Sequence, residues 1–406
     1  MKKRKGGVTA AKGFQAASTA AGIKYTGRTD MALLYSEVPC AAAGTFTQNV
    51  VKAAPVLWDQ RIVAGKTAQA VVINAGIANA CTGAEGMHYC EETAALAAGL
   101  LDVSAESVLV ASTGVIGMQL PMDRLAAGVR AMAGQLSSGM EAGNAAAKAI
   151  MTTDTHEKES AYTFELDGRT VTIGGMCKGS GMIHPNMSTM LGFVTTDLAI
   201  TPELLQEALS ADVKDTFNMI SVDGDTSTND TLLLLANGMA GNPLISEKDE
   251  KYEIFCAALR AVNTDLAKMM AGDGEGATAL FEVQVRGADT KEHARILARS
   301  VICSSLTKAA IFGHDANWGR ILCALGYAGV EFDPENVDLD FESALGHLAI
   351  YSGGRALPYS EEEATAILSC PEVRALVDLH MGEEEATAWG CDLSYDYVRI
   401  NADYRS

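Results

Sequence analysis

The segment from Lys178 to Thr196 constrains the fold more than any other part of this 406-residue chain. Two glycines and a proline follow Lys178 closely, so the backbone can bend there where no regular element continues. Residues 190–196 are mostly apolar and bounded by polar residues, which predicts a buried strand. A bent loop is therefore expected to bring the hydroxyl of Thr189 to the edge of a core strand.

Thr189 is a candidate nucleophile that could also supply its own base. A threonine hydroxyl reacts poorly until a base takes its proton, and this segment has no His/Asp pair at triad-like positions. If the Ser188–Thr189 bond is broken, Thr189 gains an α-amine with an ordinary pKa of about 7.7–8.0, which can accept that proton near neutrality. The Thr189 oxygen can break the bond itself by attacking the carbonyl of the small residue Ser188, leaving an ester that water opens. A turn followed by a core strand would explain the same residues without any chemistry.

Composition limits the class of protein. With 51 acidic and 31 basic residues, the chain carries a net charge of −20, which disfavours binding to nucleic acid or to an anionic membrane. Surface charge is screened within about 10 Å at 0.1 M salt, so an anionic amino-acid substrate is still compatible with a local cation. No apolar run reaches the ~18 residues that span a bilayer. Nine scattered cysteines form no CxxC pair, so we expect a reducing cytoplasm.

Hydrophobic patterns predict a mixed α and β chain with two parts. Buried strands are expected at 68–73, 107–111, 231–235 and 279–286, and helices at 91–101, 250–270 and 290–306. Glycines break the alanine-rich segment 123–151 into one or two helices, a hairpin turns at Asp167-Gly168, and Thr201-Pro202 opens a helix. The glycine-rich segment 272–276 marks a boundary, after which a smaller domain is expected from about 280 to 390.

Several blocks in this order resemble the ornithine acetyltransferase family, the glutamate N-acetyltransferases of arginine biosynthesis. Segments 178–183 and 185–191 are similar to the family's autoprocessing motif, and further matching blocks lie at 74–83, 112–117, 222–230, 315–320 and 395–406. The resemblance covers nearly the whole chain. It implies an α+β fold with a layered αββα-type sandwich and a second, smaller α/β domain. The catalytic domain would be 1–279 joined by the tail 391–406, and the smaller domain would be 280–390.

The resemblance also implies an activity. Cleavage between Ser188 and Thr189 would give an alpha chain, 1–188, and a beta chain, 189–406, with two copies of each in the assembly. Thr189 would take acetyl from N-acetylornithine as an ester, release ornithine, and pass acetyl to glutamate in a ping-pong sequence. No cofactor or metal is implied, and the sequence leaves open whether acetyl-CoA is a second donor. Ser188 stands where alanine is commonest in the family, which leaves a small residue before the nucleophile.

The residue pattern and the family resemblance together give the candidate site residues. Thr113 and Gly114 follow a predicted strand, and a hydroxyl beside an unhindered backbone N–H can form a two-donor oxyanion hole, the role that the matching family residues have. The positions that match the family's substrate contacts are Thr152, Lys178, Thr189, Glu275, Asn401 and Ser406. Among them, Lys178 can pair with a carboxylate and Glu275 with an ammonium group. Without the resemblance, each would be an ordinary turn or a solvated surface charge.

Two other functions remain open from the residues alone. One is an amidase or aminopeptidase that uses the same threonine with water as acceptor, and the other is an amino-acid-binding protein that is never cleaved. Motifs for a P-loop, a dinucleotide fold, a zinc protease and an EF-hand all fail at required positions. The aspartates at 223, 225 and 230 are accordingly expected to form a turn.

Overall fold

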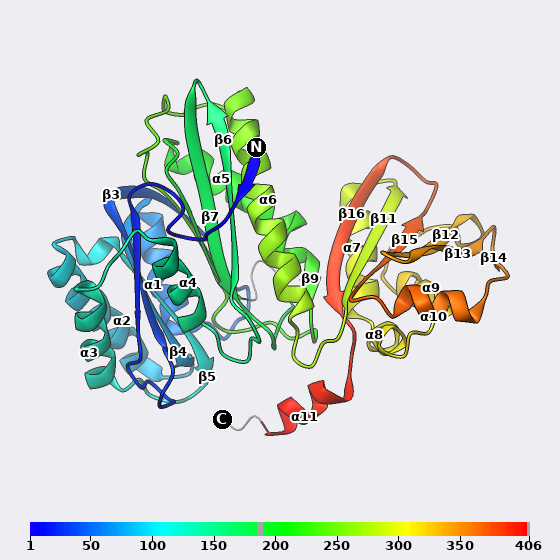
Figure 1. Ribbon diagram of the computed structural model, residues 1–406, viewed down its shortest axis with the longest axis horizontal. Helices are drawn as coiled ribbons and strands as arrows, with labels where there is room; N and C mark the ends of the chain where they lie inside the picture. Colours follow the sequence, from blue (N-terminus) through cyan, green and yellow to red (C-terminus); the bar gives the residue numbers. More distant parts are fainter. Residues whose placement is uncertain (185–189, 404–406) are drawn as a thin grey trace.

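A nine-stranded sheet forms the centre of the larger part of the molecule in the computed structural model, which describes residues 1–184 and 190–403 (Figure 1). Its strand order is β1-β6-β7-β8-β10-β3-β4-β5, with β2 also paired to β3. The strands are β1 (Lys2–Arg4), β2 (Phe14–Thr19), β3 (Met31–Phe46), β4 (Thr67–Ile77), β5 (Val108–Val115), β6 (Lys158–Leu166), β7 (Arg169–Lys178), β8 (Leu191–Thr196) and β10 (Thr231–Ala236). The predicted strands at 68–73, 107–111 and 231–235 are thus confirmed.

Helices cover both faces of this sheet. Successive side chains of a strand point to opposite faces, so each face has its own core. In β8, Phe193 joins the core shared with helices α1–α4, whereas Val194 joins the core shared with α5 and α6. The helices are α1 (Ala54–Ala64), α2 (Gly83–Leu101), α3 (Met122–Ala133), α4 (Met140–Ala149), α5 (Pro202–Asp212) and α6 (Glu250–Gly272). The α+β class with layers of helices and sheet is confirmed.

Local signals placed several elements correctly. The β6–β7 hairpin turns at Asp167 and Gly168, whose φ angles of 48° and 73° are both positive, as a two-residue type I′ turn requires. The alanine-rich segment forms two helices, α3 and α4, separated by residues 134–139. The helix expected at 290–306 is interrupted, however. Ser304 caps a new helix by accepting a hydrogen bond from the Thr307 amide at 3.3 Å, so α7 ends at Cys303.

A second sheet forms the smaller part, with the order β14-β13-β12-β15-β11-β16-β9. Strand β9 precedes α6 in the sequence, among elements of the larger part, but it pairs with β16 of the second sheet through Ile220 and Trp389. The elements are β9 (Ile220–Ser221), β11 (Leu280–Ala288), α7 (Lys291–Cys303), α8 (Ser305–Phe312), α9 (Trp318–Gly326), β12 (Asp338–Ser343), β13 (Gly346–Ser352), β14 (Arg355–Ala356), α10 (Glu361–Leu368), β15 (Glu372–Asp378) and β16 (Glu384–Cys391). The proposed division at 279/280 stays a prediction.

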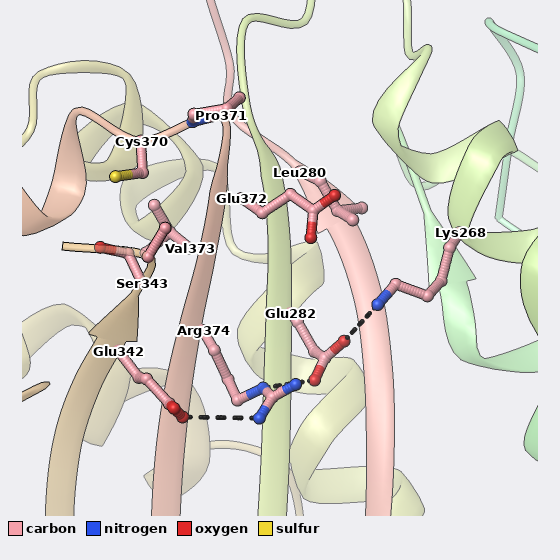
Figure 2. A pocket seen from close by; sticks show the side chains of 11 residues that line it. Lys268, Leu280, Glu282, Glu342, Ser343, Cys370, Pro371, Glu372, Val373 and Arg374 are labelled. Carbon is pink, nitrogen blue, oxygen red and sulfur yellow. Dashed lines mark hydrogen bonds and ion pairs between the residues drawn. The ribbon is translucent and has the colours of Figure 1, made fainter. Parts of the chain in front are cut away.

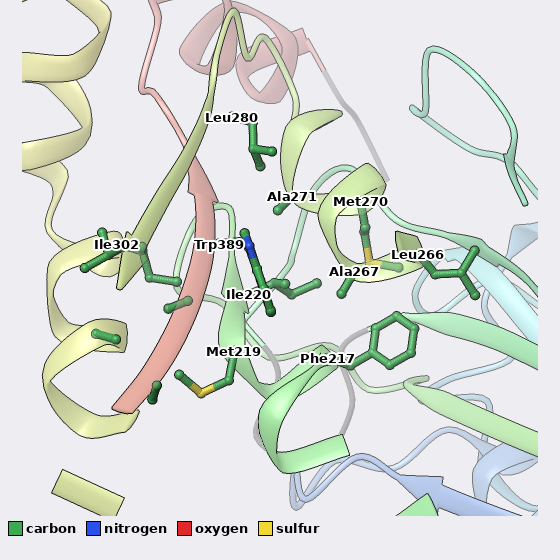
Figure 3. Close-up of a cluster of buried hydrophobic side chains, with 14 of the residues drawn as sticks. Phe217, Met219, Ile220, Leu266, Ala267, Met270, Ala271, Leu280, Ile302 and Trp389 are labelled. Atoms are coloured by element: carbon green, nitrogen blue, oxygen red, sulfur yellow. The ribbon is translucent and has the colours of Figure 1, made fainter. Parts of the chain in front are cut away.

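An apolar cluster joins the two parts (Figure 3). Phe217, Leu266 and Met270 come from the larger part, and Ile302 and Trp389 come from α7 and β16 of the smaller part. Burial of side chains of this size contributes about 1.5–3 kcal/mol each. The cluster therefore fixes the end of α6 against the second sheet, and the segment that follows α6 carries Glu275.

The chain then returns towards the larger part through helix α11 (Tyr395–Asp403), which lies below the two parts in Figure 1. Tyr397 donates a hydrogen bond from its hydroxyl to Asp223 at 3.2 Å, and Ser394 donates one to the Gly276 carbonyl at 2.5 Å. These contacts bring Asn401 close to the segment after α6. No helix within residues 1–184 and 190–403 is both long and apolar enough to cross a membrane.

Candidate active site

Lys178 and Thr113 meet at the ends of strands β7 and β5. The Lys178 side chain is buried, with 8% of the residue exposed, and its Nζ donates to Thr113 Oγ1 at 3.4 Å. Burial lowers the pKa of Lys178, while the nearby Asp154 carboxylate acts in the opposite direction. Because the ammonium group donates to the Thr113 oxygen, the hydroxyl hydrogen of Thr113 is left to donate to a different acceptor.

Gly114 occupies a position that only glycine can fill. Its φ is +128°, and a Cβ atom there would lie 2.2 Å from the backbone carbon of Gly76 on β4. The carbonyl of Ser112 accepts a hydrogen bond from Asn229 at 2.8 Å, on the side away from β4. Hydrogen-bonding groups alternate along a strand, so the Gly114 N–H faces that same side. The hydroxyl of Thr113 and this N–H are therefore available at one strand end.

A buried ionic network supports the neighbouring segments. Lys158 is completely buried, and its Nζ lies 2.8 Å from Asp154 Oδ1 and 2.6 Å from Asp273 Oδ2. Asp154 in turn accepts hydrogen bonds from the amides of Gly179 at 2.8 Å and Thr152 at 3.0 Å. Burial opposes ionisation of Asp154, but Lys178 and Lys158 outweigh it and hold the pKa of this carboxyl below its ordinary value. The network thus fixes two backbone segments of the site.

Glu275 lies directly against the loop that follows β7. Its amide donates to the Ser180 carbonyl at 3.0 Å, and its Oε2 accepts a hydrogen bond from Asn401 at 2.8 Å. A Cβ atom on Gly181 would come within 2.4 Å of the Glu275 carboxyl carbon. A side chain at Gly181 would therefore displace the Glu275 carboxyl group from its place.

The described ends of this loop are both held in place. Asp223 accepts hydrogen bonds from the amides of Met182 at 2.6 Å and Ile183 at 2.9 Å. On the other side, the carbonyl of Met190 accepts from the Thr231 amide at 2.8 Å, where β8 and β10 begin to pair in parallel. Asp223 was expected only to form a turn, but it also fixes the start of the segment that leads to Thr189.

All six of the predicted site residues that the structure describes line one cavity of about 150 Å³. This volume is well below the ~300 Å³ lower end for drug-sized ligands, so it suits a small molecule. Ser188, Thr189 and Ser406 lie outside the described residues, and their roles stay predictions. Within the described ranges no three Asp, Glu, His or Cys side chains are grouped to hold a metal ion. The predicted residues that line the cavity are Thr113, Gly114, Thr152, Lys178, Glu275 and Asn401.

Sequence reasoning missed other polar residues around this cavity. Asn229 and Asp230 line it directly. Lys158, Asp154 and Asp273 do not line it, but they form the buried network that holds the neighbouring backbone. Asn229 and Asp230 lie in one of the blocks that carry the family resemblance, which was the available signal. The buried network had no such signal, because Asp273 lies 115 positions after Lys158 and the three residues match no motif spacing.

A larger cavity of about 420 Å³ lies between α6 and the second sheet (Figure 2). Glu282 at its wall accepts a hydrogen bond from Trp389 Nε1 at 2.7 Å and pairs with Lys268 at 3.2 Å and Arg374 at 2.5 Å. Arg374 also pairs with Glu342 at 3.4 Å, and Figure 2 shows these paired side chains pointing together, with Glu372 apart from them. None of the predicted site residues lines this cavity.

Comparison with known proteins agrees with the resemblance seen in the sequence. The ArgJ family model matches residues 15–406. The chain is 56% identical to the arginine biosynthesis bifunctional protein ArgJ of Symbiobacterium thermophilum over 99% of both chains, and 51% identical to ArgJ 1 of Clostridium acetobutylicum over 97% and 96%. A crystal structure of the Bacillus halodurans protein is 47% identical with a TM-score of 0.50, covering 52% of this chain and 98% of that one. The chain therefore belongs to the ArgJ family.

Proposed function

We propose that this chain is an ornithine acetyltransferase that moves acetyl from N-acetylornithine to glutamate through an ester on Thr189. The observation that carries the proposal is the convergence of six predicted residues, from five separate segments of the chain, on one cavity. Met190, the residue that follows Thr189, also lines this cavity. The names of the curated relatives support a place in arginine biosynthesis.

In this proposal, each group at the cavity has a chemical task. The Thr113 hydroxyl and the Gly114 N–H stabilise the negative charge that develops on the attacked carbonyl oxygen. Lys178 pairs with a substrate carboxylate, and Glu275 with an ammonium group, while Thr152, Asn401 and the C-terminal residue Ser406 orient the polar ends. The α-amine of Thr189 is the base, and no cofactor or metal takes part. Acetyl-CoA is a candidate second acetyl donor, which is tested by giving it to the enzyme in place of N-acetylornithine.

The α-amine requires self-cleavage between Ser188 and Thr189. The Bacillus halodurans chain supports such cleavage, because 98% of it aligns with only 52% of this chain. A fragment that begins at Thr189 makes up a similar share, a little over half of the chain. We further propose that two alpha and two beta fragments assemble in the cytoplasm, where cysteines that form no disulfide in the structure would remain reduced.

Intact mass and N-terminal sequencing of the purified protein test the cleavage first. We expect two fragments, 1–188 and 189–406, in the native protein and in the control Thr170→Ala, which changes an exposed threonine. Thr189→Ala should remain one chain. An active, uncut native protein would refute the mechanism, since Thr189 would then lack its α-amine.

Incubation with N-acetylornithine, with and without glutamate, then identifies the acceptor. The transferase produces N-acetylglutamate only when glutamate is present. An amidase or aminopeptidase would release acetate in both incubations, and a binding protein would yield neither product. Replacing N-acetylornithine with acetyl-CoA shows whether a second donor is used.

A further inference from the structure

Asp230 is a buried carboxyl group in the cavity to which the proposed function gives no task. Only 2% of the residue is exposed, and it lines the cavity together with Thr113 and Lys178. Its Oδ2 has no hydrogen-bond partner among the described residues. Leaving a buried polar atom unpaired costs about 1–3 kcal/mol. Asp230 thus combines two observations, a carboxyl oxygen that the described residues leave unpaired and a place among the residues that line the cavity.

The backbone around Asp230 is held by both sides of the site. The next residue, Thr231, opens β10 and donates to the Met190 carbonyl at 2.8 Å. The preceding residue, Asn229, donates to the Ser112 carbonyl at 2.8 Å, beside the Thr113-Gly114 strand end. Asp230 thus lies between the strand that follows Thr189 in sequence and the strand that carries the proposed oxyanion hole.

The surroundings favour a carboxyl group that holds a proton. Burial raises the pKa of Asp230 well above its ordinary value, more than Ser227 and Lys178 lower it. Lys178 and Glu275 are the other charged side chains that line the cavity. A group whose pKa is moved towards the working pH is suited to proton transfer, whereas Asp154, whose pKa is lowered, remains ionised.

We propose that Asp230 is a further catalytic residue, whose carboxyl group gives a proton to the departing amine and takes one from the incoming amine. This inference rests on the proposed function, because it concerns the two amines of that reaction. It assigns to Asp230 a task that the Thr189 α-amine, which handles the hydroxyl proton, does not perform.

The protons balance over the two half-reactions. In the first, the Thr189 oxygen adds to the acetyl carbonyl, its proton goes to the α-amine, and the C–N bond breaks as Asp230 protonates the departing nitrogen. In the second, the amine of glutamate adds to the ester, Asp230 takes a proton from that nitrogen, and the C–O bond breaks as the α-ammonium returns its proton to Thr189. Water takes one proton from glutamate before the attack and gives one to the released ornithine.

The test compares Asp230→Asn with Asp225→Asn, which changes an exposed aspartate of the same segment. Steady-state rates are measured over a range of pH with N-acetylornithine and glutamate, and cleavage is measured by intact mass. We expect Asp230→Asn to be cleaved, which also shows that it folds. Its kcat should fall by about 10²–10⁴-fold, the usual contribution of general acid–base catalysis. At rising pH, kcat/KM for N-acetylornithine should fall in the wild type as Asp230 loses its proton and as Lys178, whose pKa burial lowers, loses its own, and only the Lys178 decrease should remain in this variant.

Other results would overturn the assignment. An unchanged kcat and pH profile would show that Asp230 transfers no proton, and a raised KM with unchanged kcat would make it a binding group. An uncut Asp230→Asn chain would move its role to cleavage. Failure of the wild-type protein to form N-acetylglutamate would instead refute the proposed function, which separates the two failures.

Discussion

Lys158→Met tests how much the buried network contributes to the site. Methionine retains most of the volume of lysine but removes the cation from between Asp154 and Asp273, whose oxygens lie 2.8 and 2.6 Å from Nζ. Both carboxylates are almost completely buried, so they lose a partner that water cannot replace. Removing one partner of a buried pair costs about 3–5 kcal/mol, and we expect the free energy of unfolding to fall by that amount.

The matched control is Lys148→Met. Lys148 pairs with Glu157 at 3.4 Å, but the two side chains are 53% and 32% exposed. Such a pair contributes roughly 0–1 kcal/mol, so this variant should unfold almost like the parent. Urea unfolding followed by fluorescence measures both, in a Thr189→Ala background so that one chain unfolds. If the two substitutions cost the same within about 1 kcal/mol, the network is not the support inferred for the site.

The pH dependence gives an independent measurement on the same network. The pKa of Asp154 is lowered in the folded state, so its stabilising contribution is present above the ordinary pKa of 3.8 and is lost as pH falls through the folded value. Without Lys158 the carboxyl is protonated more easily. The cost of Lys158→Met should therefore be smaller at pH 4 than at pH 7, and an equal cost at both would contradict the electrostatic explanation.

Three further substitutions test single features. Thr113→Ala should cost about 2.7–4 kcal/mol of transition-state stabilisation in kcat/KM, with an unchanged circular dichroism spectrum, because it removes one donor to the oxyanion. Gly181→Ala should displace the Glu275 carboxyl and weaken binding of an ammonium-bearing substrate by about 1.5–3 kcal/mol, measured by calorimetry, and unchanged affinity would contradict the role of Glu275. Burial raises the pKa of Asp59, so its stabilising contribution is fully present below pH 3.8 and is lost as pH rises through the folded pKa. Asp59→Asn should therefore gain melting temperature over the wild type at pH 8 but not at pH 4, whereas exposed Asp225→Asn should show no such trend.

The sequence by itself determined the features that depend on local backbone preference. Asp167 and Gly168 adopt positive φ angles at low cost, so the β6–β7 hairpin depends on these two residues and not on distant contacts. Thr113 and Gly114 are neighbours, so one strand end presents both donors. The apolar run after Met190 favours a strand, and β8 is indeed buried along its whole length. The remaining predicted contacts of the cavity came from the family resemblance, and the structure brings the described ones together.

Tertiary structure alone decided which charges are buried and which side chains they meet. Nothing in the local sequence distinguishes Lys158 from a solvated lysine, yet it lies between two carboxylates that come from before and after it in the chain. Asn401 reaches Glu275 only because the chain returns as helix α11. The sequence predicted Asp230 only as a turn residue, whereas the structure shows that its Oδ2 is buried and unpaired among the described residues. The physical reason is that desolvation and pairing depend on the three-dimensional surroundings of a group, whereas turns and strands depend on its neighbours in sequence.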